Sequence, residues 1–345
     1  VLQLAQELKI DGIMSFGVDP GVVTAAFVAE KMNLPFQCSY EAACILQDKS
    51  RFRQFLKEHN FNVPNAKGYA SIEVALKDVD YFHWPVIVKP VDSAGSKGVS
   101  RVDTPEALLE AVSYALSEAH NGHFIIEDFL DKKGCSSDSD CFSINGKLAF
   151  CSFSDQKFDL DADNPYTPAA YSWPSTMPKY AKEELTNELQ RLMTLLHVKT
   201  GVYNVETRLC TNGKPYIMEL SPRGGGNRLS EMLRYITHTD LIDNAVLNAV
   251  GEKIEEIQQP CYDGCLAEII LHSDKSGIFR KLIIDKEFEK QFVIEKDLWV
   301  ENGDKVEGFT GANKAIGTLA LHFSSHQELE ENVQYYKNKI TIIVD

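Results

Sequence analysis

The stretch that decides the fold is Gly201–Gly226, GVYNVETRLCTNGKPYIMELSPRGGG. It contains two runs of alternating side chains joined by Asn212-Gly213, a dipeptide typical of two-residue hairpin turns because a type I′ turn needs positive φ at both positions. In the register that this turn sets, Glu206 lies opposite Glu219 as a non-hydrogen-bonded pair, with Cα atoms about 4.5 Å apart. The sequence therefore predicts a β-hairpin that brings two carboxylates together.

The same register divides the hairpin into two faces. The face predicted in the core carries Val205, Thr207, Leu209, Tyr216, Met218 and Leu220. The opposite face carries Glu206, Arg208, Ile217, Glu219 and Ser221. Like charges directly opposite each other repel, so we expect a cation between the two glutamates, and Mg²⁺ held by carboxylate and phosphate oxygens fits. Neutralisation by Arg208 on a solvated face is the alternative that the hairpin alone leaves open.

Composition excludes several other classes of protein. The chain has 345 residues, with 44% hydrophobic and 25% charged residues, which is ordinary for a globular protein of two or three domains. Its net charge of −15 makes nucleic acid an unexpected partner, and no apolar run reaches the roughly 18–20 residues of a membrane span. Eight cysteines without a CxxC pair predict reduced thiols in a cytoplasmic protein.

The remaining pattern alternates strands and helices. At the start, Ile10–Phe16 is predicted as a buried strand and Val22–Met32 as a helix opened by Asp19-Pro20. Because one strand and one helix cannot bury a core and the first residue is not Met, we expect the natural chain to begin upstream. Residues 154–178 are rich in Asp, Pro, Ser and Tyr and are predicted as a long loop. The other predicted elements are a helix from Asp48 to about His59, strands at Trp84–Val91 and Phe124–Leu130, a hairpin at Cys141–Phe153 and helices at 179–199 and Asp240–Val250.

Three further segments could contact a nucleotide or another anion. Lys89 ends a predicted strand and precedes the loop 92–99 (DSAGSKGV), whose small residues let backbone N–H groups approach anionic oxygens. The segment 124–130 (FIIEDFL) could present backbone groups and a carboxylate to adenine. Arg223 and Arg228, which follow the hairpin, suit bidentate recognition of carboxylate or phosphate. Each feature has an alternative when it is taken singly. The loop 92–99 could be a surface turn, and the segment 124–130 could be an ordinary strand end. Arg228 could form a salt bridge with Glu231.

In their order along the chain, these motifs resemble the ATP-grasp superfamily, in its carboxylate–amine (amino-acid) ligase and carbamoyl-phosphate-synthase-like branch. The resemblance covers nearly the whole chain and implies a mixed α/β and α+β architecture. Residues 48–250 would form the ATP-grasp fold, two α+β lobes that clamp a nucleotide, with the flap-bearing lobe at about 66–126. Residues 1–47 would be the C-terminal part of a preceding parallel α/β domain, and residues 251–345 a small α+β domain.

The resemblance also implies roles for particular residues. The nucleotide would contact Lys49, Lys89, Ser93, Gly95, Ser96, Gly98, Glu127, Asp128, Phe129 and Leu130. Mg²⁺ or Mn²⁺ would be bound by Glu206, Glu219 and Ser221, although the family usually has Asn where Ser221 stands. Lys89 and Arg223 would be catalytic, and the substrate would contact Arg223, Gly225, Arg228 and Lys157. Weaker candidates are Asp138 for the ribose, in place of the family's Glu, and Tyr166, Tyr171 and His238 for the substrate.

The implied activity is an ATP-dependent, ADP-forming ligation of a small carboxylate to an amine through an acyl phosphate. ATP and Mg²⁺ would be the cofactors, and a homodimer is expected from the family. The flap at 93–98 and the loop at 154–178 would keep water from the acyl phosphate. Two alternatives remain open at this point: a bicarbonate-phosphorylating carboxylase or carbamoyl-phosphate-synthase-like enzyme, and an ATP-binding sensor without catalysis.

Overall fold

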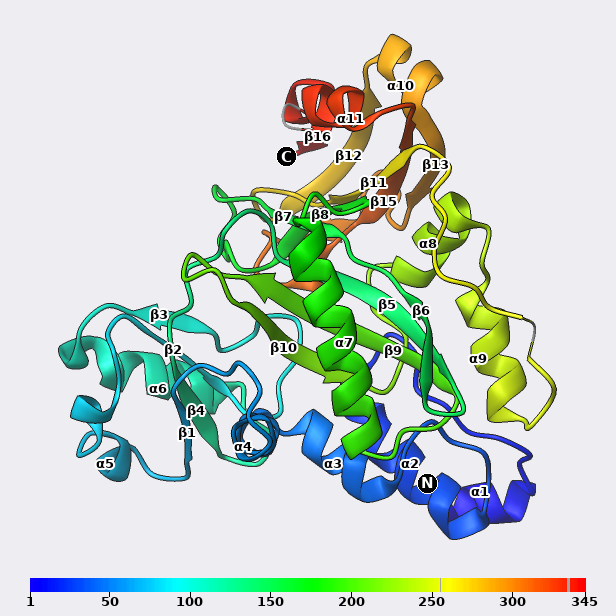
Figure 1. The fold of residues 1–345 in the computed structure, drawn as a ribbon. Helices are drawn as coiled ribbons and strands as arrows, with labels where there is room; N and C mark the ends of the chain where they lie inside the picture. The colour runs from blue at the N-terminus through cyan, green and yellow to red at the C-terminus, as the bar shows by residue number, and fades with distance from the viewer. Residues whose placement is uncertain (255, 334–335) are drawn as a thin grey trace.

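Antiparallel pairing dominates the sheets of this chain. The computed structural model describes residues 1–254, 256–333 and 336–345, and within these ranges it has four sheets with helices packed against them (Figure 1). Every ladder between the named strands is antiparallel. The predicted mixture of α/β and α+β structure is confirmed. No helix in the described ranges is both long and apolar enough to cross a membrane.

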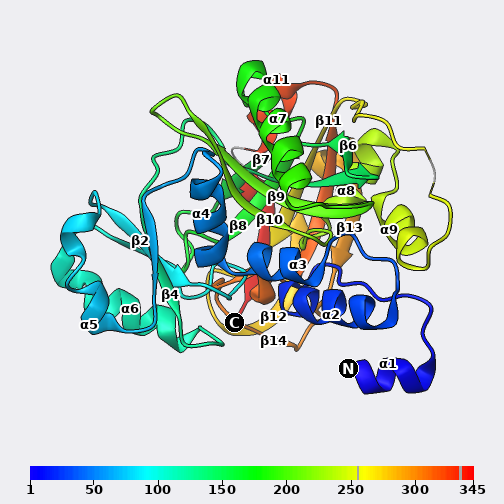
Figure 2. The ribbon, with the colours of Figure 1, turned by 60° about the horizontal axis from the view of Figure 1, so that its bottom comes forward.

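The N-terminal segment is helical, and its predicted strand is absent. Its helices are α1 (Leu2–Leu8), η1 (Asp19–Gly21), α2 (Val22–Met32) and α3 (Tyr40–Gln47). The strand prediction for Ile10–Phe16 is wrong, because no other strand lies beside this segment and only Phe16 forms a parallel bridge, to Gly224. Figure 2 shows α1 projecting from the body of the molecule, while α2 and α3 lie against it.

The flap-bearing lobe is a small sheet covered by one helix. Its strand order is β1 (Ala66–Tyr69), β4 (Phe124–Asp128), β2 (Val86–Pro90) and β3 (Ser100–Val102). Alternate residues Val86 and Val88 point into a core shared with Leu108 and Val112 of α6 (Leu108–Ser117). Three short elements complete this lobe: α5 (Ile72–Ala75), η2 (Val79–Tyr81) and η3 (Pro105–Ala107).

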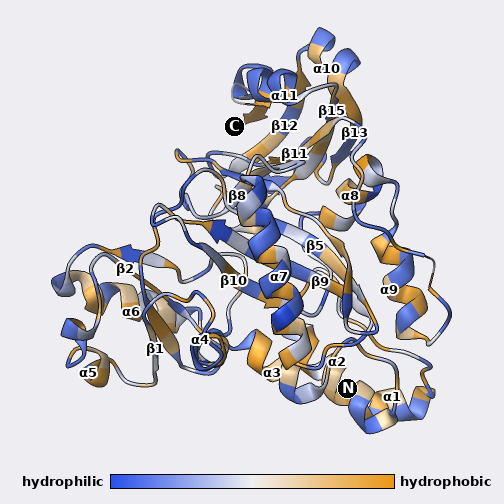
Figure 3. Ribbon diagram, viewed as in Figure 1, coloured by the Kyte–Doolittle hydropathy of each residue, from blue (hydrophilic) through white to orange (hydrophobic). Residues whose placement is uncertain are grey.

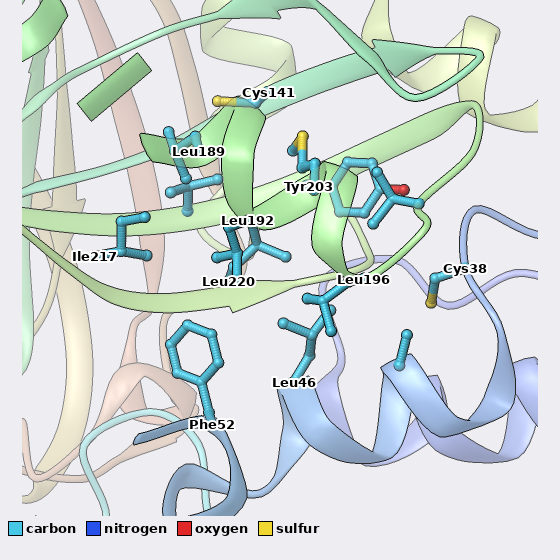
Figure 4. Packing of buried hydrophobic residues seen from close by; sticks show 14 of the residues in the cluster. Cys38, Leu46, Phe52, Cys141, Leu189, Leu192, Leu196, Tyr203, Ile217 and Leu220 are labelled. Carbon is cyan, nitrogen blue, oxygen red and sulfur yellow. The ribbon is translucent and has the colours of Figure 1, made fainter. Parts of the chain in front are cut away.

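The central sheet carries the hairpin that the sequence singled out. Its order is β10 (Pro215–Ser221), β9 (Gly201–Leu209), β5 (Ser137–Ile144) and β6 (Lys147–Cys151). One face packs on α7 (Lys179–Leu195), α3 and α4 (Lys49–Glu58), and Figure 4 shows Leu189 and Leu192 of α7 meeting Ile217 and Leu220 of β10. Asp48 begins α4 by accepting hydrogen bonds from two backbone N–H groups of its first turn. Figure 3 shows both hydrophilic and hydrophobic residues along α7. This is expected for a helix that packs on a core with one face and is exposed to solvent on the other.

A third sheet corrects the prediction of a long loop. Residues 154–178 include β7 (Asp155–Phe158) and β8 (Pro168–Trp173), which join β11 (Cys265–Leu271), β15 (Gly317–Phe323) and β13 (Val293–Leu298) in the order β13-β15-β11-β8-β7. The loop prediction is wrong for these strands. Residues 169–173 are all buried, so the strand lacks the alternation of polar and apolar residues by which a sequence indicates a half-exposed strand. Helices α8 (Leu229–Thr237) and α9 (Leu241–Ala249) contribute to the core beneath it.

The C-terminal strands complete the molecule. The fourth sheet has the strand order β14 (Lys305–Val306), β12 (Gly277–Ile284) and β16 (Ile340–Val344). Two helices, α10 (Lys286–Phe292) and α11 (His326–Val333), share its core. This part of the chain also has two short helices, η4 (Ala312–Lys314) and η5 (Tyr336–Asn338). Because β7 and β8 belong to one sheet with β11, β15 and β13, the boundary predicted near residue 250 falls between strands of a single sheet.

Candidate active site

The hairpin places Glu206 directly opposite Glu219, as predicted, but the turn and the register that lead to this pairing differ from the prediction. The turn has positive φ at Gly213 alone, and Cys210 bonds to both Gly213 and Lys214, so the loop is longer than the predicted two residues. This shifts the first pairs by one residue, so that Pro215 lies opposite Leu209. A bulge between Ile217 and Glu219 then restores the expected pairing at Glu206.

The bulge also corrects the predicted faces. Ile217, expected on the polar face, is buried in the core beneath the sheet, and Met218, expected in the core, lines the cavity beside Glu219. Two consecutive residues of the bulged strand oppose one residue of the partner, so strict alternation of side chains fails there.

A cavity of about 1030 Å³ lies between the flap-bearing lobe, the central sheet and the β7–β8 hairpin. Both glutamates line it, and most of the predicted nucleotide-contacting residues do as well. Those predicted residues are Lys49, Lys89, Ser93, Gly95, Ser96, Glu127, Asp128, Phe129 and Leu130. Arg223, Lys157, Asp138, Tyr166 and Tyr171 also line this cavity. The tertiary structure thus brings together candidates that span more than half of the chain.

Cations flank both carboxylates of the hairpin. The Lys49 Nζ lies 3.3 Å from an oxygen of Glu219 and also donates to the carbonyl of Ser93, 3.0 Å away. Arg208 approaches Glu206 at 3.8 Å. Burial, together with Glu219, raises the pKa of Glu206, while Arg208 partly offsets the effect. Two hard oxygen donors that face a cavity and repel each other are a donor set that suits Mg²⁺ or Mn²⁺.

Lys89 is held by a buried ion pair. Its Nζ lies 3.0 Å from Glu127, and Arg53 of α4 lies 2.9 Å from the other oxygen of the same carboxylate. Burial alone would raise the pKa of Glu127, but Arg53 and Lys89 lower it to about 2. The Glu127 carboxylate therefore orients Lys89 instead of facing an adenine edge, and an adenine contact remains a prediction for the backbone at Asp128–Leu130.

Arg223 is tied to the N-terminal segment. It donates from Nε and Nη2 to the two oxygens of Asp19, 2.9 and 2.6 Å away, and from Nη1 to the carbonyl of Gly224. These bonds use three of the five N–H donors of a guanidinium. Local sequence does not indicate this partner, because Asp19-Pro20 is typical of the start of a helix.

Ser221 lies two residues after Glu219 on β10, on the same face of the strand. Its hydroxyl donates to Asp19 and accepts from the Gln47 amide, and the residue is only 1% exposed. Its role as a metal ligand remains a prediction, and its hydroxyl is already bonded to Asp19 and Gln47. Asn204 lies opposite Ser221 in the sheet and lines the cavity.

Four other predicted residues lie outside the cavity lining. Gly98 has φ +70 and lies against Pro90, and its contact with a nucleotide remains a prediction. Gly225 donates its buried N–H to Asp140. Arg228 forms ion pairs with Glu231 and, in the C-terminal part, with Glu295. His238 ends α8 and is largely exposed.

The two segments predicted to exclude water contact each other. Ser96 of the flap donates to the carbonyl of Tyr166, at 3.0 Å, and Asn164 donates to the carbonyls of Ser96 and Thr310, at 3.3 and 3.1 Å. The loop between β7 and β8 therefore bridges the flap and the C-terminal part over the cavity.

Three polar residues of the cavity were not among the main predicted site residues. Asp138 and Tyr171 were weaker candidates, and Gln156 was not predicted. Asp138 lies opposite Glu206 on β5, and burial together with Glu206 raises its pKa to about 7. Gln156 and Tyr171, on β7 and β8, line the same cavity, and the Tyr171 hydroxyl donates to Asp138 at 3.3 Å. The acidic residues at 138–140 could have indicated Asp138. Gln156 and Tyr171 had no such local signal, because the sheet that holds β7 and β8 includes a strand, β11, about a hundred residues later.

Comparisons with known proteins agree with this geometry. A family model described as an ATP-grasp domain matches residues 82–231. The carbamoyl phosphate synthase large chain of Thermoanaerobacter sp. (strain X514) is 23% identical over 265 residues, which cover 74% of this chain and 23% of that protein. The chain thus spans about a quarter of the length of the curated relatives it matches.

Solved structures share the fold over nearly the full chain. The L-amino acid ligase from Bacillus licheniformis has a TM-score of 0.82 at 22% identity, covering 99% of this chain and 83% of that one. The biotin carboxylase domain dimer of Hydrogenobacter thermophilus 2-oxoglutarate carboxylase, in complex with MgADP and bicarbonate, has a TM-score of 0.74 at 14% identity, covering 99% and 77%. Residues 82–231 therefore match an ATP-grasp domain, and the chain shares its fold with these solved structures.

Proposed function

We propose that this protein is an ATP-dependent, ADP-forming ligase that joins a carboxylate to an amine through an acyl phosphate. The observation that carries the proposal is the Glu206–Glu219 pair on the wall of a cavity that also holds Lys49 and Lys89. Paired carboxylates and lysines in one cavity suit a metal-bound triphosphate. The solved structures support the fold, and the residues of the cavity support the chemistry.

The reaction requires no nucleophile from the protein. An oxygen of the substrate carboxylate forms a bond to the γ-phosphorus of ATP, and the bond from that phosphorus to the ADP oxygen breaks. The amine nitrogen then forms a bond to the acyl carbon, the bond from that carbon to the phosphate oxygen breaks, and one proton leaves the nitrogen. The chain positions the reactants and neutralises charge.

Each side chain has a part in this positioning. Glu206 and Glu219 would hold Mg²⁺, which neutralises phosphate charge when bound. Lys89, oriented by Glu127, and Lys49 would contact phosphate oxygens. Arg223 would stabilise the transferred phosphoryl group with the N–H groups that Asp19 and Gly224 leave unused. The Ser96–Tyr166 contact would exclude water from the acyl phosphate.

The experiment is a measurement of ADP and phosphate release with Mg²⁺ and ATP, first with pooled amino acids and then with pooled small carboxylates. Release that needs a carboxylate and an amine together supports the ligase. Release with bicarbonate alone would favour the bicarbonate-phosphorylating reaction, the second candidate, which the carbamoyl phosphate synthase relatives support. ATP binding without release under any condition would favour a sensor.

We further propose a homodimer in the cytoplasm, where ATP is present and cysteines stay reduced. One structural neighbour is a domain dimer, which supports the dimer for this chain. Sedimentation equilibrium at micromolar concentration distinguishes 38.7 kDa from twice that mass.

A further inference from the structure

Two cysteines face each other at the edge of the central sheet. Cys141 on β5 lies directly opposite Cys151 on β6, both thiols are free, and their sulfur atoms are 3.7 Å apart. The Cys151 N–H donates to the Gln259 side chain, as expected for a non-hydrogen-bonded pair, whose N–H groups point away from the partner strand. Such a pair has Cα atoms about 4.5 Å apart, within the range of about 4.4–6.8 Å that disulfides span. A disulfide between these cysteines therefore requires little displacement of either strand.

A second cavity, of about 480 Å³, gives access to one of the two sulfurs. Cys151 lines it together with Phe153, Thr186 and Tyr262, whereas Cys141 is 0% exposed and belongs to the core beneath the sheet (Figure 4). Among the described residues, none that lines this cavity also lines the candidate active site. A reagent that enters this second cavity therefore meets Cys151 first.

The charge of the second cavity favours an anionic reagent. Of the described residues that line it, those with a charged side chain are Lys179, Lys182 and Glu183 of α7. Glu183 pairs with Lys179 at 3.6 Å, while Lys182 donates to the carbonyl of Ser175. The lining thus has one positive charge in excess on a chain whose net charge is −15, and such a local excess attracts anions.

The position of β6 gives the cysteine pair a structural consequence. In the sheet order β10-β9-β5-β6, strand β6 lies at the edge and pairs with β5 alone. An edge strand is held by a single ladder of hydrogen bonds. A covalent bond from β6 to β5 would hold this edge in place and would restrict the unfolded chain as well.

We propose that Cys141 and Cys151 are a redox-active pair, which an anionic low-molecular-weight disulfide oxidises through the second cavity to a cross-strand disulfide. Transient disulfides of this kind are compatible with a compartment that keeps most thiols reduced. The inference does not depend on the proposed function, because the pair and its cavity are separate from the candidate active site.

The oxidation takes place in two exchange steps. The Cys151 sulfur, as a thiolate, forms a bond to one sulfur of the small disulfide, whose S–S bond breaks and releases one small thiolate. The Cys141 sulfur, after losing its proton, then forms a bond to Cys151 Sγ, and the bond from Cys151 to the second small thiolate breaks. The two protein sulfurs lose two electrons, the small disulfide gains them, and the two protons end on the released thiols.

The test treats the reduced full chain with glutathione disulfide and maps the cysteines by mass spectrometry after acid quenching and alkylation. Wild type should give a linked Cys141–Cys151 peptide, with two glutathione molecules released for each bond. Cys141→Ser should stop at a glutathione adduct on Cys151, and Cys151→Ser should leave Cys141 unmodified. Cys261→Ser, which removes the exposed cysteine, should still give the linked peptide. Absence of the linked peptide from folded wild type, or a bond from Cys151 to Cys261 in its place, would overturn the proposal.

The charge of the reagent tests the route. Lys179→Gln should slow the reaction with glutathione disulfide about 3-fold at low salt, as expected for one charge in a solvated site. The same variant should not slow the reaction with cystamine, a cationic disulfide. Glu183→Gln, a matched variant of the same cavity, should not slow the reaction with glutathione disulfide. An equal change with both reagents would overturn the route through this cavity.

Thermal unfolding tests the consequence for the edge strand. The oxidised wild type should unfold roughly 4 °C above the reduced chain, as a disulfide that closes a short loop predicts for a chain of this size. Cys141→Ser treated in the same way should show no such shift. An oxidised wild type with the linked peptide and an unchanged Tm would overturn the stabilising role of the bond.

Discussion

At the scale of single residues, the site depends on charges that hold one another in place. Lys49 is shared between Glu219 and the flap backbone, and Lys89 is held by Glu127. Removing one member therefore affects both ligand binding and stability, and the two effects can be separated by measurement.

Glu219→Ala should abolish Mg²⁺-dependent ATP turnover while the fold survives, since it removes one of two facing like charges. The Lys49 ion pair that is lost with it lies at a partly exposed position and is worth little. ADP release and thermal unfolding measure the two effects. The exposed acid Glu183 on α7 provides a matched control, Glu183→Ala, which should retain activity. Wild-type turnover in Glu219→Ala would disprove the metal assignment.

Glu127→Gln should destabilise the protein by roughly 3–5 kcal/mol at pH 7, because it leaves Arg53 and Lys89 buried without a counterion. In the folded protein the pKa of Glu127 is about 2, below its ordinary value of 4.5, because Arg53 and Lys89 stabilise the carboxylate. Its contribution to stability is therefore fully present above pH 4.5 and is lost as the pH falls towards 2. Urea unfolding of wild type and variant at pH 7 and at pH 3 checks this, and a difference that grows at the lower pH would contradict the assignment.

Among the elements of the fold, the turn between β9 and β10 and the loop between β7 and β8 position the residues of the site. Gly213 closes the hairpin with φ +78, and nothing lies within 4 Å of a Cβ built there. Asn164 connects the flap to the C-terminal part.

Gly213→Ala should lower the free energy of unfolding by about 1–2 kcal/mol, through backbone strain alone. Gly213→Asn should cost less, because Asn tolerates the left-handed conformation. Chemical denaturation of both variants measures the difference. Equal stability of the two would show that the turn does not require positive φ.

Asn164→Ala should loosen the cover over the cavity, because it removes two hydrogen bonds to backbone carbonyls. If the chain is a ligase, phosphate should then form in excess over ligated product, since water reaches the acyl phosphate. The ratio of phosphate to product measures this leak. As a control, Asn62→Ala removes an amide that bonds only outside the cavity and should leave the ratio unchanged.

At the scale of the whole molecule, the C-terminal part is built into the fold. Strand β11 lies between β8 and β15, and Tyr171 of the cavity pairs with Glu268 of β11. Arg228, at the start of α8, pairs with Glu295 on β13. The C-terminal strands therefore support one wall of the site.

A chain that ends at residue 250 should not fold to a nucleotide-binding state. The truncation removes the strand that pairs with β8 and exposes Tyr171 and Trp173, which are 1% and 0% exposed in the full chain. Limited proteolysis and binding of a hydrophobic dye measure the outcome. Cooperative unfolding of the truncated chain with intact nucleotide binding would support an independent domain boundary near residue 250.

Four features could be predicted from the sequence: the hairpin, its two facing glutamates, the capped helix that presents Lys49 and the flap after Lys89. Turn residues, helix caps and alternation act over a few neighbours, so local sequence is enough for them. The order of the motifs is also enough to resemble a family. The other features depend on the tertiary fold. The bulge at Met218, the Asp19 partner of Arg223 and the burial of Ser221 all depend on contacts between segments far apart in the chain. Gln156 and Tyr171 reach the cavity because their strands join a sheet through β11, which lies about a hundred residues later in the chain.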